Sequence, residues 1–400
     1  MSGRVTAGRA GAPGVRRDRY RVLIVADRFE PGYRAGGPVR SLRQVIDAAG
    51  ADIDVAIVTR DRDLGDLAPY PGLSGRWVDR ERETVFYLNA ASPRQWWTLT
   101  RTARAAQWDL LYVNSVWSRL SIVFVLAARV GLLRTNCVLV APRGEMGSGA
   151  LGVKRMRKKV FLALWRHVLG GSRFRWHATA PAEAVDIRRA FPAARAPFVV
   201  AAAGPEPQGH PEEPATDGPP RLVFVGRISP MKNLDLVLAA LAEVRTPVVL
   251  DVYGPADDPA YWRRCRRLWA ALPPHVRATW HGPLLPDQVA GAFARSHAFV
   301  LPTRGENFGH VIGESLSVGC PVICSDRTPW TELLRSGGGE VLPDVTVDAV
   351  RAAIQRVVDR SPAQRHAARV AAAAAYRAWH ARAGDTRSLL DQVREAAHAG

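Results

Sequence analysis

Two glutamates stand close together in the stretch "LPTRGENFGHVIGESLSVGCPVICS", which begins at Leu301. Glu306 lies in a polar loop after an apolar run, and Glu314 lies in the pattern of a half-buried helix, where a carboxylate is costly without a partner. A helix from Gly309 places Glu314 on the same side as His310 and near Ser317. A ligand rich in hydroxyl groups would satisfy both acids. The alternative is two unrelated carboxylates, one in a loop and one paired with an arginine.

A second stretch, "GRISPMKNLDLVLAAL", offers two cations between a strand and a helix. Gly226 lets the chain turn out of the strand. Arg227 and Lys232 both precede the helix, whether its cap is Ser229 with Pro230 or Asn233. Arginine can hold two phosphate oxygens with its planar fork, and lysine adds a compact charge. Two solvated surface cations are the alternative, since the whole chain is basic.

A third loop, "FEPGYRAGGPVRSL", has Gly36 and Gly37 immediately before Pro38, which suits the first turn of a helix. Backbone N–H groups at a helix N-terminus form an anion site, and a tight turn without a ligand is the alternative. Taken together, the three loops supply amides and two cations for a diphosphate, and two carboxylates for hydroxyl-rich groups on either side of it. That combination describes a nucleotide-sugar.

The elements that would position these loops alternate regularly. Buried apolar runs predict strands at residues 21–27, 52–59, 109–115, 137–142 and 176–180, and again at 221–226, 247–254, 298–303 and 321–325. Helical patterns lie between most of them. Continuous apolar strands that alternate with helices indicate parallel sheets covered on both faces. We therefore expect two doubly wound, Rossmann-like α/β domains that face a central cleft, with the ligand at the carboxyl ends of the strands.

A composition break separates the two halves. Residues 204–220, "GPEPQGHPEEPATDGPP", are rich in Pro, Gly and acid, so we predict a linker over 205–220 between domains at 20–204 and 221–375. Residues 1–19 are Gly, Ala and Arg without an apolar centre, which predicts a disordered basic lead rather than a signal peptide. The longest apolar stretch, residues 121–133, is too short to span a bilayer. We expect a cytoplasmic protein.

The composition bears on partners and metals. The chain has 55 Lys and Arg against 37 Asp and Glu, a net charge of +18, which favours anionic partners, although general composition bias explains it equally well. The four cysteines are scattered along the sequence, and we predict that all of them are reduced thiols in the core. Asp61-Arg62-Asp63 is a D-x-D triplet, but it follows a strand of the wrong half for this donor site. We expect no metal and no cofactor other than the nucleotide-sugar substrate, of UDP or GDP type.

One segment suggests a further surface. Residues 154–175 hold eight Lys or Arg and no acid, and Val153, Met156, Val160, Leu164 and Val168 recur at helical spacing. A basic amphipathic helix over 153–175 could rest on an anionic membrane, at its inner face, where lipid-linked sugar acceptors are found. The alternative is an ordinary helix that packs its apolar stripe on the sheet.

The motifs also resemble a family. "GRISPMKNLD" followed by "GENFGHVIGESLSVGCPVICSD" is similar to the signature of the group 1 (family 4) retaining glycosyltransferases of GT-B architecture. "PGYRAGGPVRSL" resembles the first glycine loop of that family, "VLVAPRGEMGSGAL" its acceptor-side loop, and "WHATAPAEAVDIRR" the end of its N-terminal domain. The segment around Trp379 resembles its closing helix, for which we predict residues 376–400.

The resemblance implies roles for individual residues. Arg227 and Lys232 would hold the donor diphosphate and stabilise it as it leaves. Glu306, with the backbone around Asn307, Phe308 and Gly309, would hold the transferred sugar, and Glu314 would bind the ribose hydroxyls. Gly36 and Gly37 would also contact the donor. In the acceptor-side loop Arg143 stands where many relatives have a histidine, so Arg143, Gly144 and Glu145 are acceptor-side candidates and an enzymic base is in doubt.

The implied function is a metal-independent, retaining sugar transfer to a glycan, lipid-linked or small-molecule acceptor in polysaccharide or glycoconjugate synthesis, with the leaving phosphate taking the acceptor's proton. A nucleotide-sugar hydrolase or epimerase of the same fold is one alternative. A basic nucleic-acid-binding protein is another, but no binding motif and no interleaved exposed aromatics support it. Selectivity for the base and the sugar is expected to depend on the loops at residues 253–254 and 281–283.

Overall fold

The chain forms two compact units, which are Met1–Ala202 with Thr386–Gly400 (unit 1) and Ala203–Asp385 (unit 2). The structure is a computed structural model, and it describes residues 19–147, 155–200, 204–209, 218–383 and 387–398. The lead predicted at residues 1–19 therefore lies outside the described residues except for Arg19, and so does residue range 210–217 of the predicted linker.

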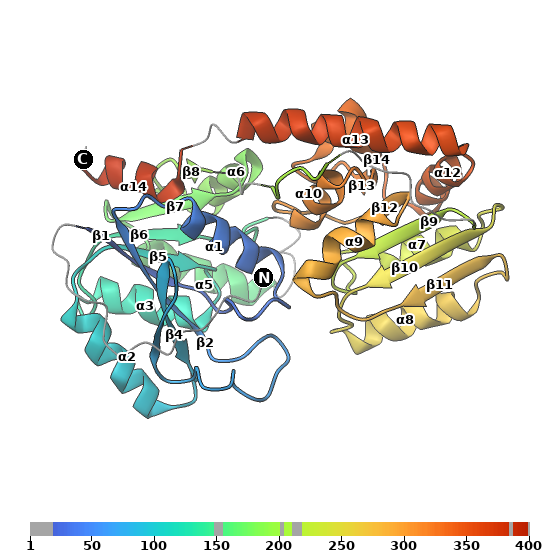
Figure 1. The fold of residues 1–400 in the computed structure, drawn as a ribbon. Helices are drawn as coiled ribbons and strands as arrows, with labels where there is room; N and C mark the ends of the chain where they lie inside the picture. The colour runs from blue at the N-terminus through green and yellow to red at the C-terminus, as the bar shows by residue number, and fades with distance from the viewer. Residues whose placement is uncertain (1–18, 148–154, 201–203, 210–217, 384–386, 399–400) are drawn as a thin grey trace. The chain divides into compact units, whose positions relative to one another are not determined.

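Unit 1 is built on an eight-stranded sheet with the order β3-β4-β2-β1-β5-β6-β7-β8 (Figure 1). All neighbouring strands are parallel except β3 and β4. The strands are β1 Tyr20–Val25, β2 Ile53–Arg60, β3 Trp77–Asp79, β4 Glu83–Leu88, β5 Trp108–Asn114, β6 Thr135–Ala141, β7 Phe174–Ala178 and β8 Phe198–Val199.

Helices cover both faces of this sheet because its central strands are apolar on both sides. On one face α2 (Pro93–Ala105), α3 (Arg119–Arg129), α5 (Arg155–Val168) and α6 (Pro181–Ala190) enclose a core that includes Leu111, Val113 and Trp165. On the other face α1 (Gly37–Asp47) and α14 (Leu389–His398) enclose a second core around Ile24 and Tyr112. Alternate residues of one strand therefore supply different cores.

Unit 2 contains a six-stranded parallel sheet with the order β11-β10-β9-β12-β13-β14. In chain order this is 3-2-1-4-5-6, the Rossmann arrangement, and the order reverses between β9 and β12. The strands are β9 Arg221–Val225, β10 Val248–Tyr253, β11 Val276–Trp280, β12 Ala298–Leu301, β13 Val322–Ser325 and β14 Gly339–Leu342.

Helix α8 (Pro259–Ala270) of unit 2 begins at a recognisable start signal. The N-cap of α8 is Asp258, whose carboxylate accepts hydrogen bonds from the N–H groups of Ala260 and Tyr261, and Pro259 occupies the first turn.

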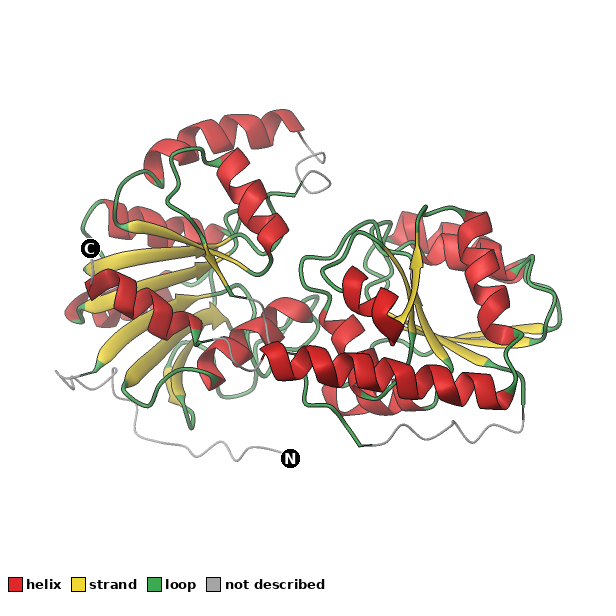
Figure 2. Cartoon of the chain, turned by 90° about the horizontal axis from the view of Figure 1, so that it is seen from above, coloured by secondary structure: helices red, strands yellow, loops and turns green. Residues whose placement is uncertain are grey.

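Helices lie on both sides of the strands in each unit (Figure 2). Those of unit 2 are α7 Leu234–Leu241, α8 Pro259–Ala270, η1 Pro286–Gln288, α9 Val289–Ala294, α10 His310–Ser317, α11 Thr331–Leu333, η2 Leu334–Gly338, α12 Val347–Val358 and α13 Pro362–Ala383.

Some predicted bounds are wrong. A single closing helix over residues 376–400 does not form: α13 runs from Pro362 to Ala383 in unit 2, and α14 belongs to unit 1. The Ala-rich helical segment expected at residues 371–375 lies within α13, but alanine gives this helix little amphipathic contrast, so the sequence pattern did not define its bounds. Strands β3, β4, β8, β11 and β14 were also missed. Four of these five strands, all except β4, lack a continuous apolar run. In β11, three of the residues after Val276 are exposed.

All four cysteines are buried and unpaired, as expected of core thiols. Among the helices of the described residues, none combines the length and the hydrophobicity that crossing a bilayer requires.

Candidate functional site

The site in unit 2 forms where the strand order reverses. Strands β9 and β12 are hydrogen-bonded neighbours, and the loops that follow them, residues 226–233 and 302–309, lead into α7 and α10. These are the loops that carry Arg227, Lys232 and Glu306. In an open parallel sheet this reversal leaves a crevice at the carboxyl ends of the strands, where ligands bind.

Lys232 and Glu306 meet across this point. The Nζ atom of Lys232 lies 2.5 Å from Oε1 of Glu306, and the two side chains are only 16% and 10% exposed. The sequence placed both residues at the site but did not predict that they pair, because they are 74 positions apart. A cation and a carboxylate are thus held together where both are largely shielded from solvent, so an incoming charged group would interact strongly with both.

Further hydrogen bonds fasten the two loops together. Asn233 is buried in the left-handed conformation, and its Nδ2 donates to the carbonyl of Pro302 at 2.7 Å. The Arg304 guanidinium donates to Oδ1 of Asn233, and the backbone N–H of Arg304 donates to the carbonyl of Met231. Asn233 is the N-cap residue of α7, yet its side chain makes no capping bond. It therefore links two loops instead of closing its own helix.

Arg227 differs from Lys232 in its surroundings. Its side chain is exposed, and no described residue makes a hydrogen bond or an ion pair with its guanidinium. The turn before it is tight: a Cβ atom at Gly254 would lie 1.9 Å from the carbonyl oxygen of Gly226, so only glycine fits there. Arg227 is accordingly displayed from a rigid turn with its donors available.

Aromatic side chains hold the loop from Glu306 to Gly309 in place. Gly309 has a φ of 77° and is the N-cap residue of α10, which has no side-chain cap. Phe308 is buried, and its carbonyl accepts a hydrogen bond from Nε1 of Trp330 at 2.5 Å. Trp330 in turn packs on Trp379 of α13, with ring centroids 4.6 Å apart. Trp379 therefore supports the sugar-binding candidate loop through Trp330.

Glu314 lies on α10 and is half-buried, as the helical spacing predicted. One turn before it, His310 is buried, and one turn after it the Ser317 hydroxyl donates to the backbone carbonyl of Glu314. All of the donor-side candidates of unit 2, namely Arg227, Lys232, Glu306, Asn307, Phe308, Gly309 and Glu314, therefore come from two loops and the first helix turns at one end of the sheet.

The two loops on which base selectivity was expected to depend line one pocket of about 460 Å³. The rings of Tyr253 and His281 stack with centroids 4.7 Å apart and planes 18° apart. His281 also contacts Asp251 at 2.8 Å, which fixes the imidazole. Pro283 belongs to the second of these loops, and the lining residues that the sequence patterns did not single out are Leu284, Asp287, Gln288, Gly291 and Arg295. Asp251 could have been noticed as an acid inside an otherwise apolar strand.

In unit 1 the glycine loop precedes α1 as predicted. Gly36 has a φ of 67°, Gly37 begins the helix and Pro38 occupies its first turn. The D-x-D triplet helps to hold this loop. Asp63 accepts hydrogen bonds from the backbone N–H groups of Tyr33 and Arg34, and Asp61 is occupied by Arg62 and Ser74. No cluster of three His, Cys, Asp or Glu residues suited to a metal occurs among the described residues.

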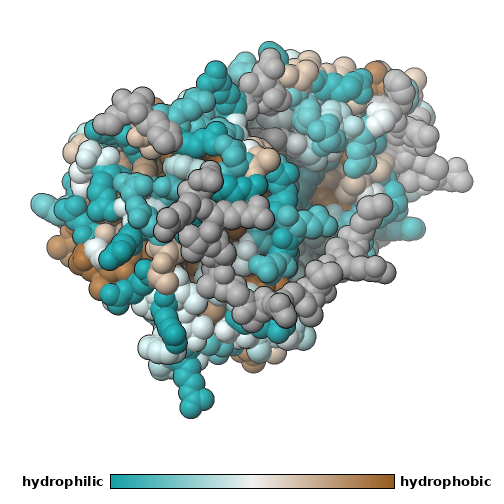
Figure 3. Space-filling view, turned by 60° about the vertical axis from the view of Figure 1, so that its left-hand side comes forward, coloured by the Kyte–Doolittle hydropathy of each residue, from teal (hydrophilic) through white to brown (hydrophobic). Residues whose placement is uncertain are grey.

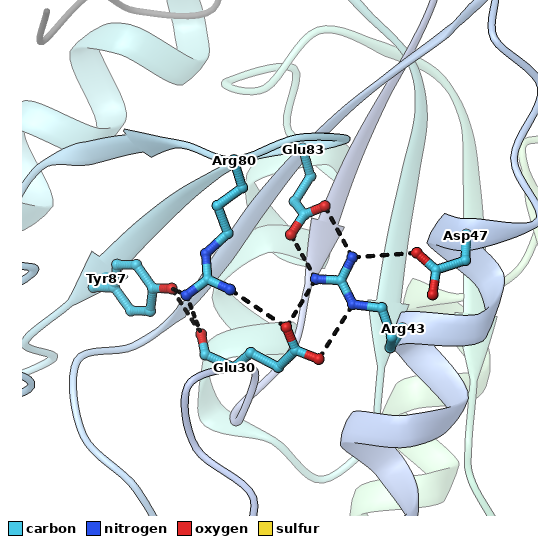
Figure 4. Close-up of polar contacts among 6 residues, drawn as sticks. All are labelled: Glu30, Arg43, Asp47, Arg80, Glu83 and Tyr87. Atoms are coloured by element: carbon cyan, nitrogen blue, oxygen red, sulfur yellow. Dashed lines mark hydrogen bonds and ion pairs between the residues drawn. The ribbon is translucent and has the colours of Figure 1, made fainter. Parts of the chain in front are cut away.

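A half-buried ion network anchors the same loop (Figure 4). The Arg43 guanidinium of α1 contacts both oxygens of Glu83 and both oxygens of Glu30, at distances between 2.6 and 3.2 Å. Arg80 adds a second cation to Glu30, and the Tyr87 hydroxyl donates to the Glu30 carbonyl. Glu30 thus ties the glycine loop to α1 and β4. This network could not be predicted from sequence patterns because its members are dispersed along the chain.

The acceptor-side candidates of unit 1 have different surroundings. Arg143 has a φ of 56°, and its guanidinium donates to Oδ1 of Asn114 and to the Tyr112 hydroxyl. That hydroxyl also contacts Nδ1 of His177, and burial lowers the pKa of His177 to about 3. The backbone N–H of Gly144 donates to buried Glu183 at 2.6 Å. Arg143 is therefore part of a packed polar network.

Glu145 is the titratable member of this loop. Its carboxylate accepts hydrogen bonds from the Ser115 hydroxyl at 2.5 Å and from the Val116 N–H at 2.6 Å. Burial raises the pKa of Glu145 to about 7, against the lowering effect of these bonds. A group with this pKa can hold or release a proton near neutral pH.

Comparison with known proteins finds a family that part of the second half of the chain matches. Residues 206–374 match the profile of the family described as "Glycosyl transferases group 1". The chain is 34% identical over 130 residues to a D-inositol 3-phosphate glycosyltransferase of Rhodococcus opacus, covering 31% of this chain and 29% of that protein. It is 30% identical over 141 residues to the O-antigen chain mannosyltransferase B of Escherichia coli, covering 33% and 35%. The chain thus spans about a third of the length of these relatives.

Solved structures share the whole fold. A sucrose-phosphate synthase from Thermosynechococcus elongatus has a TM-score of 0.73 at 20% identity, covering 94% of this chain and all of that one. Anabaena HepE, in complex with UDP and glucose, has a TM-score of 0.68 at 16% identity, covering 96% and 100%. The predicted GT-B architecture of two Rossmann-like units is confirmed. The predicted resemblance is confirmed as well, since residues 206–374 match the group 1 glycosyltransferases.

Proposed function

We propose that the protein is a retaining glycosyltransferase that moves a sugar from a nucleoside-diphosphate-sugar to a glycan, lipid-linked or small-molecule acceptor. The observation that carries the proposal is the Lys232–Glu306 pair, because a cation suited to a diphosphate lies beside a carboxylate suited to sugar hydroxyls at the reversal of the strand order. The family match over residues 206–374 and the relatives named as glycosyltransferases support it.

The cations have a clear electrostatic task. When the bond between the anomeric carbon and phosphate breaks, negative charge gathers on the leaving diphosphate and positive charge on the sugar ring. A donor placed in advance for such charge is worth about 3–4 kcal/mol in comparable oxyanion sites. Exposed Arg227 would bind phosphate oxygens with its fork, and Lys232 would divide its charge between the phosphate and Glu306.

The nucleoside would occupy the pocket beside Tyr253 and His281. Its volume of about 460 Å³ suits a base, and the stacked rings offer an aromatic surface for it. Glu314 would bind the ribose hydroxyls, and the Asn307–Gly309 backbone would bind the sugar together with Glu306. HepE is a structural neighbour crystallised with UDP and glucose, which agrees in kind with a donor of UDP or GDP type.

On the acceptor side, Arg143 is engaged by Tyr112 and Asn114, so Glu145 is the better candidate for contact with the acceptor. For a retaining transfer we propose that the leaving phosphate takes the acceptor's proton, and we propose separately that no metal participates. Glu145 would then position the acceptor hydroxyl.

The test is a thermal-shift panel of UDP, GDP, ADP and dTDP, each with magnesium and with EDTA. A nucleotide at about a hundred times its Kd should add roughly 2.7 kcal/mol to the stability of the folded protein. We expect one nucleotide to stabilise it equally in both media. No stabilisation at millimolar concentration would contradict the donor site, and stabilisation that requires magnesium would contradict the proposal that no metal is needed.

With the nucleotide identified in this way, the rate of sugar transfer and the Tm of the free protein are measured for Arg227→Ala and, as a matched control, for Arg266→Ala, which changes an exposed arginine of α8. Arg227→Ala should lower kcat of sugar transfer by about a hundredfold or more without changing the Tm of the free protein, and Arg266→Ala should change neither. An unchanged kcat in Arg227→Ala would refute the role of Arg227. Release of free sugar without an acceptor would instead indicate a hydrolase.

A further inference from the structure

The pocket beside Tyr253 and His281 is lined by two residues of opposite charge, Asp287 and Arg295. Asp287 belongs to η1, and Arg295 directly follows α9, which begins where η1 ends. One continuous helical segment therefore supplies both charges. Tyr253 is the last residue of β10, and His281 follows the last residue of β11. The pocket thus combines aromatic residues from two strand ends with an acid and a cation from a single helical segment.

The spacing along this segment brings the two charges to the same side. Asp287, Gly291 and Arg295 follow one another at intervals of four residues, which places them above one another on a helix. All three line the pocket. A Cβ atom at Gly291 would lie 3.1 Å from Nη1 of Arg295. The guanidinium therefore extends back over Gly291, toward the turn that carries Asp287, and the missing side chain of Gly291 leaves room for it.

Although they line the same pocket, the two charged residues do not pair. No ion pair or side-chain hydrogen bond joins Asp287 or Arg295 to any residue that the structure describes. Both are exposed, but hydrophilic side chains predominate on the face of the molecule in Figure 3, so exposure alone does not distinguish them. Their common pocket does distinguish them. A ligand in this pocket meets a charged acceptor and a charged donor that are both available for hydrogen bonds.

The nucleobases differ in whether they can satisfy both groups. Guanine presents two adjacent donors, N1–H and the 2-amino group, and two adjacent acceptors, O6 and N7. A carboxylate can accept from both donors, and a guanidinium can donate to both acceptors. Uracil and thymine have one N–H between two carbonyl groups, so the second oxygen of a carboxylate would lie against a carbonyl oxygen. Adenine has an acceptor at N1, and its 6-amino donor beside N7 would repel a guanidinium.

We propose that this pocket selects guanine, so that the donor is a GDP-sugar. Asp287 accepts hydrogen bonds from N1–H and the 2-amino group, and Arg295 donates to O6 and N7, while the base stacks on the aromatic pair of Tyr253 and His281. This inference rests on the proposed function and deepens it by naming the base. Asp287 and Arg295 are then the residues that determine nucleotide specificity.

The experiment measures by calorimetry the Kd of the full chain for GDP, UDP, ADP and dTDP, and for two analogues of GDP. Inosine diphosphate lacks the 2-amino group, and 7-deaza-GDP lacks the N7 acceptor. We expect GDP to bind about tenfold more tightly, or better, than UDP, ADP and dTDP. Each analogue should bind about fivefold more weakly than GDP, because each loses one hydrogen bond to a charged group.

Two variants test the residues separately. Asp287→Ala should abolish the difference between GDP and inosine diphosphate but keep the difference between GDP and 7-deaza-GDP, because only the contact with the 2-amino group is lost. Arg295→Ala should do the reverse. A merely structural role of either residue would weaken the binding of all three nucleotides alike. The control is Asp344→Ala, which removes an exposed carboxylate after β14, at the opposite edge of the same sheet, and should change no Kd.

The outcomes separate this inference from the proposed function. If none of the nucleotides binds at millimolar concentration, the donor site is contradicted and the choice of base falls with it. If UDP, ADP or dTDP binds as tightly as GDP or more tightly, the donor site stands and the assignment of guanine is overturned. A preference for GDP over both analogues that persists unchanged in both variants would overturn the roles of Asp287 and Arg295.

Discussion

At the scale of single residues, Glu145 and Glu306 differ in the groups that contact their carboxylates. Glu306 has a cation at 2.5 Å, so its charge is balanced within unit 2. Glu145 has only neutral donors, the Ser115 hydroxyl and the Val116 N–H, and it lies near a second carboxylate, Asp27. Its charged form is therefore penalised by burial, which raises its pKa to about 7.

This pKa predicts a stability that depends on pH. Since the folded-state pKa of Glu145 lies above its unfolded value, the folded protein binds the extra proton between about pH 4.5 and 7, and the free energy of unfolding must fall as pH rises through that window. The loss amounts to at most about 3 kcal/mol. Glu145→Gln removes the titration, so its unfolding free energy should change less between pH 4.5 and pH 8.

Hydrogen exchange of peptides from β5 and β6 reports the stability of unit 1 at each pH. Glu81→Gln, which changes an exposed carboxylate of the same unit, is the control and should follow the unmodified protein. If Glu145→Gln shows the same pH dependence as that control, the carboxylate of Glu145 titrates normally and its proposed role at the acceptor side loses support.

At the scale of elements, the junction between the β12 loop and α10 depends on one glycine. Gly309 is in the left-handed region, and a Cβ atom there would lie 3.1 Å from Cδ1 of Ile312 and 3.3 Å from Cβ of Glu306. An alanine at this position would therefore strain the backbone, and its Cβ atom would also press against Glu306, which pairs with Lys232. The geometry of the loop and the start of α10 are coupled at this residue.

Gly309→Ala should destabilise the protein by about 1–2 kcal/mol and should also weaken nucleotide-sugar binding severalfold, because Glu306 is displaced. Gly131→Ala is a matched control: Gly131 has the same kind of φ, at 76°, but a Cβ there would meet no described atom within 4 Å. The control should cost similar stability and leave the Kd unchanged. Equal Kd values for both variants would show that the loop tolerates the displacement.

At the scale of the whole molecule, the chain is divided between the two units in an order that the sequence patterns do not predict. It builds unit 1, then unit 2, and returns to unit 1 with α14. Leu389, Leu390 and Val393 of α14 are buried in the core that also contains α1. Arg394 adds contacts with Asp52 and Asp391. The stability of unit 1 therefore depends on residues that lie beyond unit 2 in the chain.

Leu390→Ala tests this dependence. Leu390 is fully buried, so the substitution should destabilise unit 1 by about 2–5 kcal/mol and accelerate hydrogen exchange in β1 and β2 but not in β9 and β12. The converse variant is Leu241→Ala in α7, which is equally buried and should accelerate exchange in unit 2 alone. Similar acceleration in both units by either variant would show that they unfold together.

Much of the fold could be predicted from the sequence, and the reason is local. Apolar runs such as residues 22–25 and 222–224 are wholly buried, and such continuous runs, like the helical patterns between them, can be recognised without knowledge of distant residues. The same applies to the Gly36-Gly37-Pro38 helix start and to the half-buried position of Glu314, since both follow from conformations of neighbouring residues.

The sequence by itself thus determined the two α/β halves, the loops that carry Arg227, Lys232, Glu306 and Glu314, and the family to which they point. Only the tertiary structure decided the partners of these residues. The pairing of Lys232 with Glu306, the engagement of Arg143 by Tyr112 and Asn114, and the return of α14 to unit 1 each join residues from separate parts of the chain. Such contacts depend on strand order and burial, which local patterns do not encode.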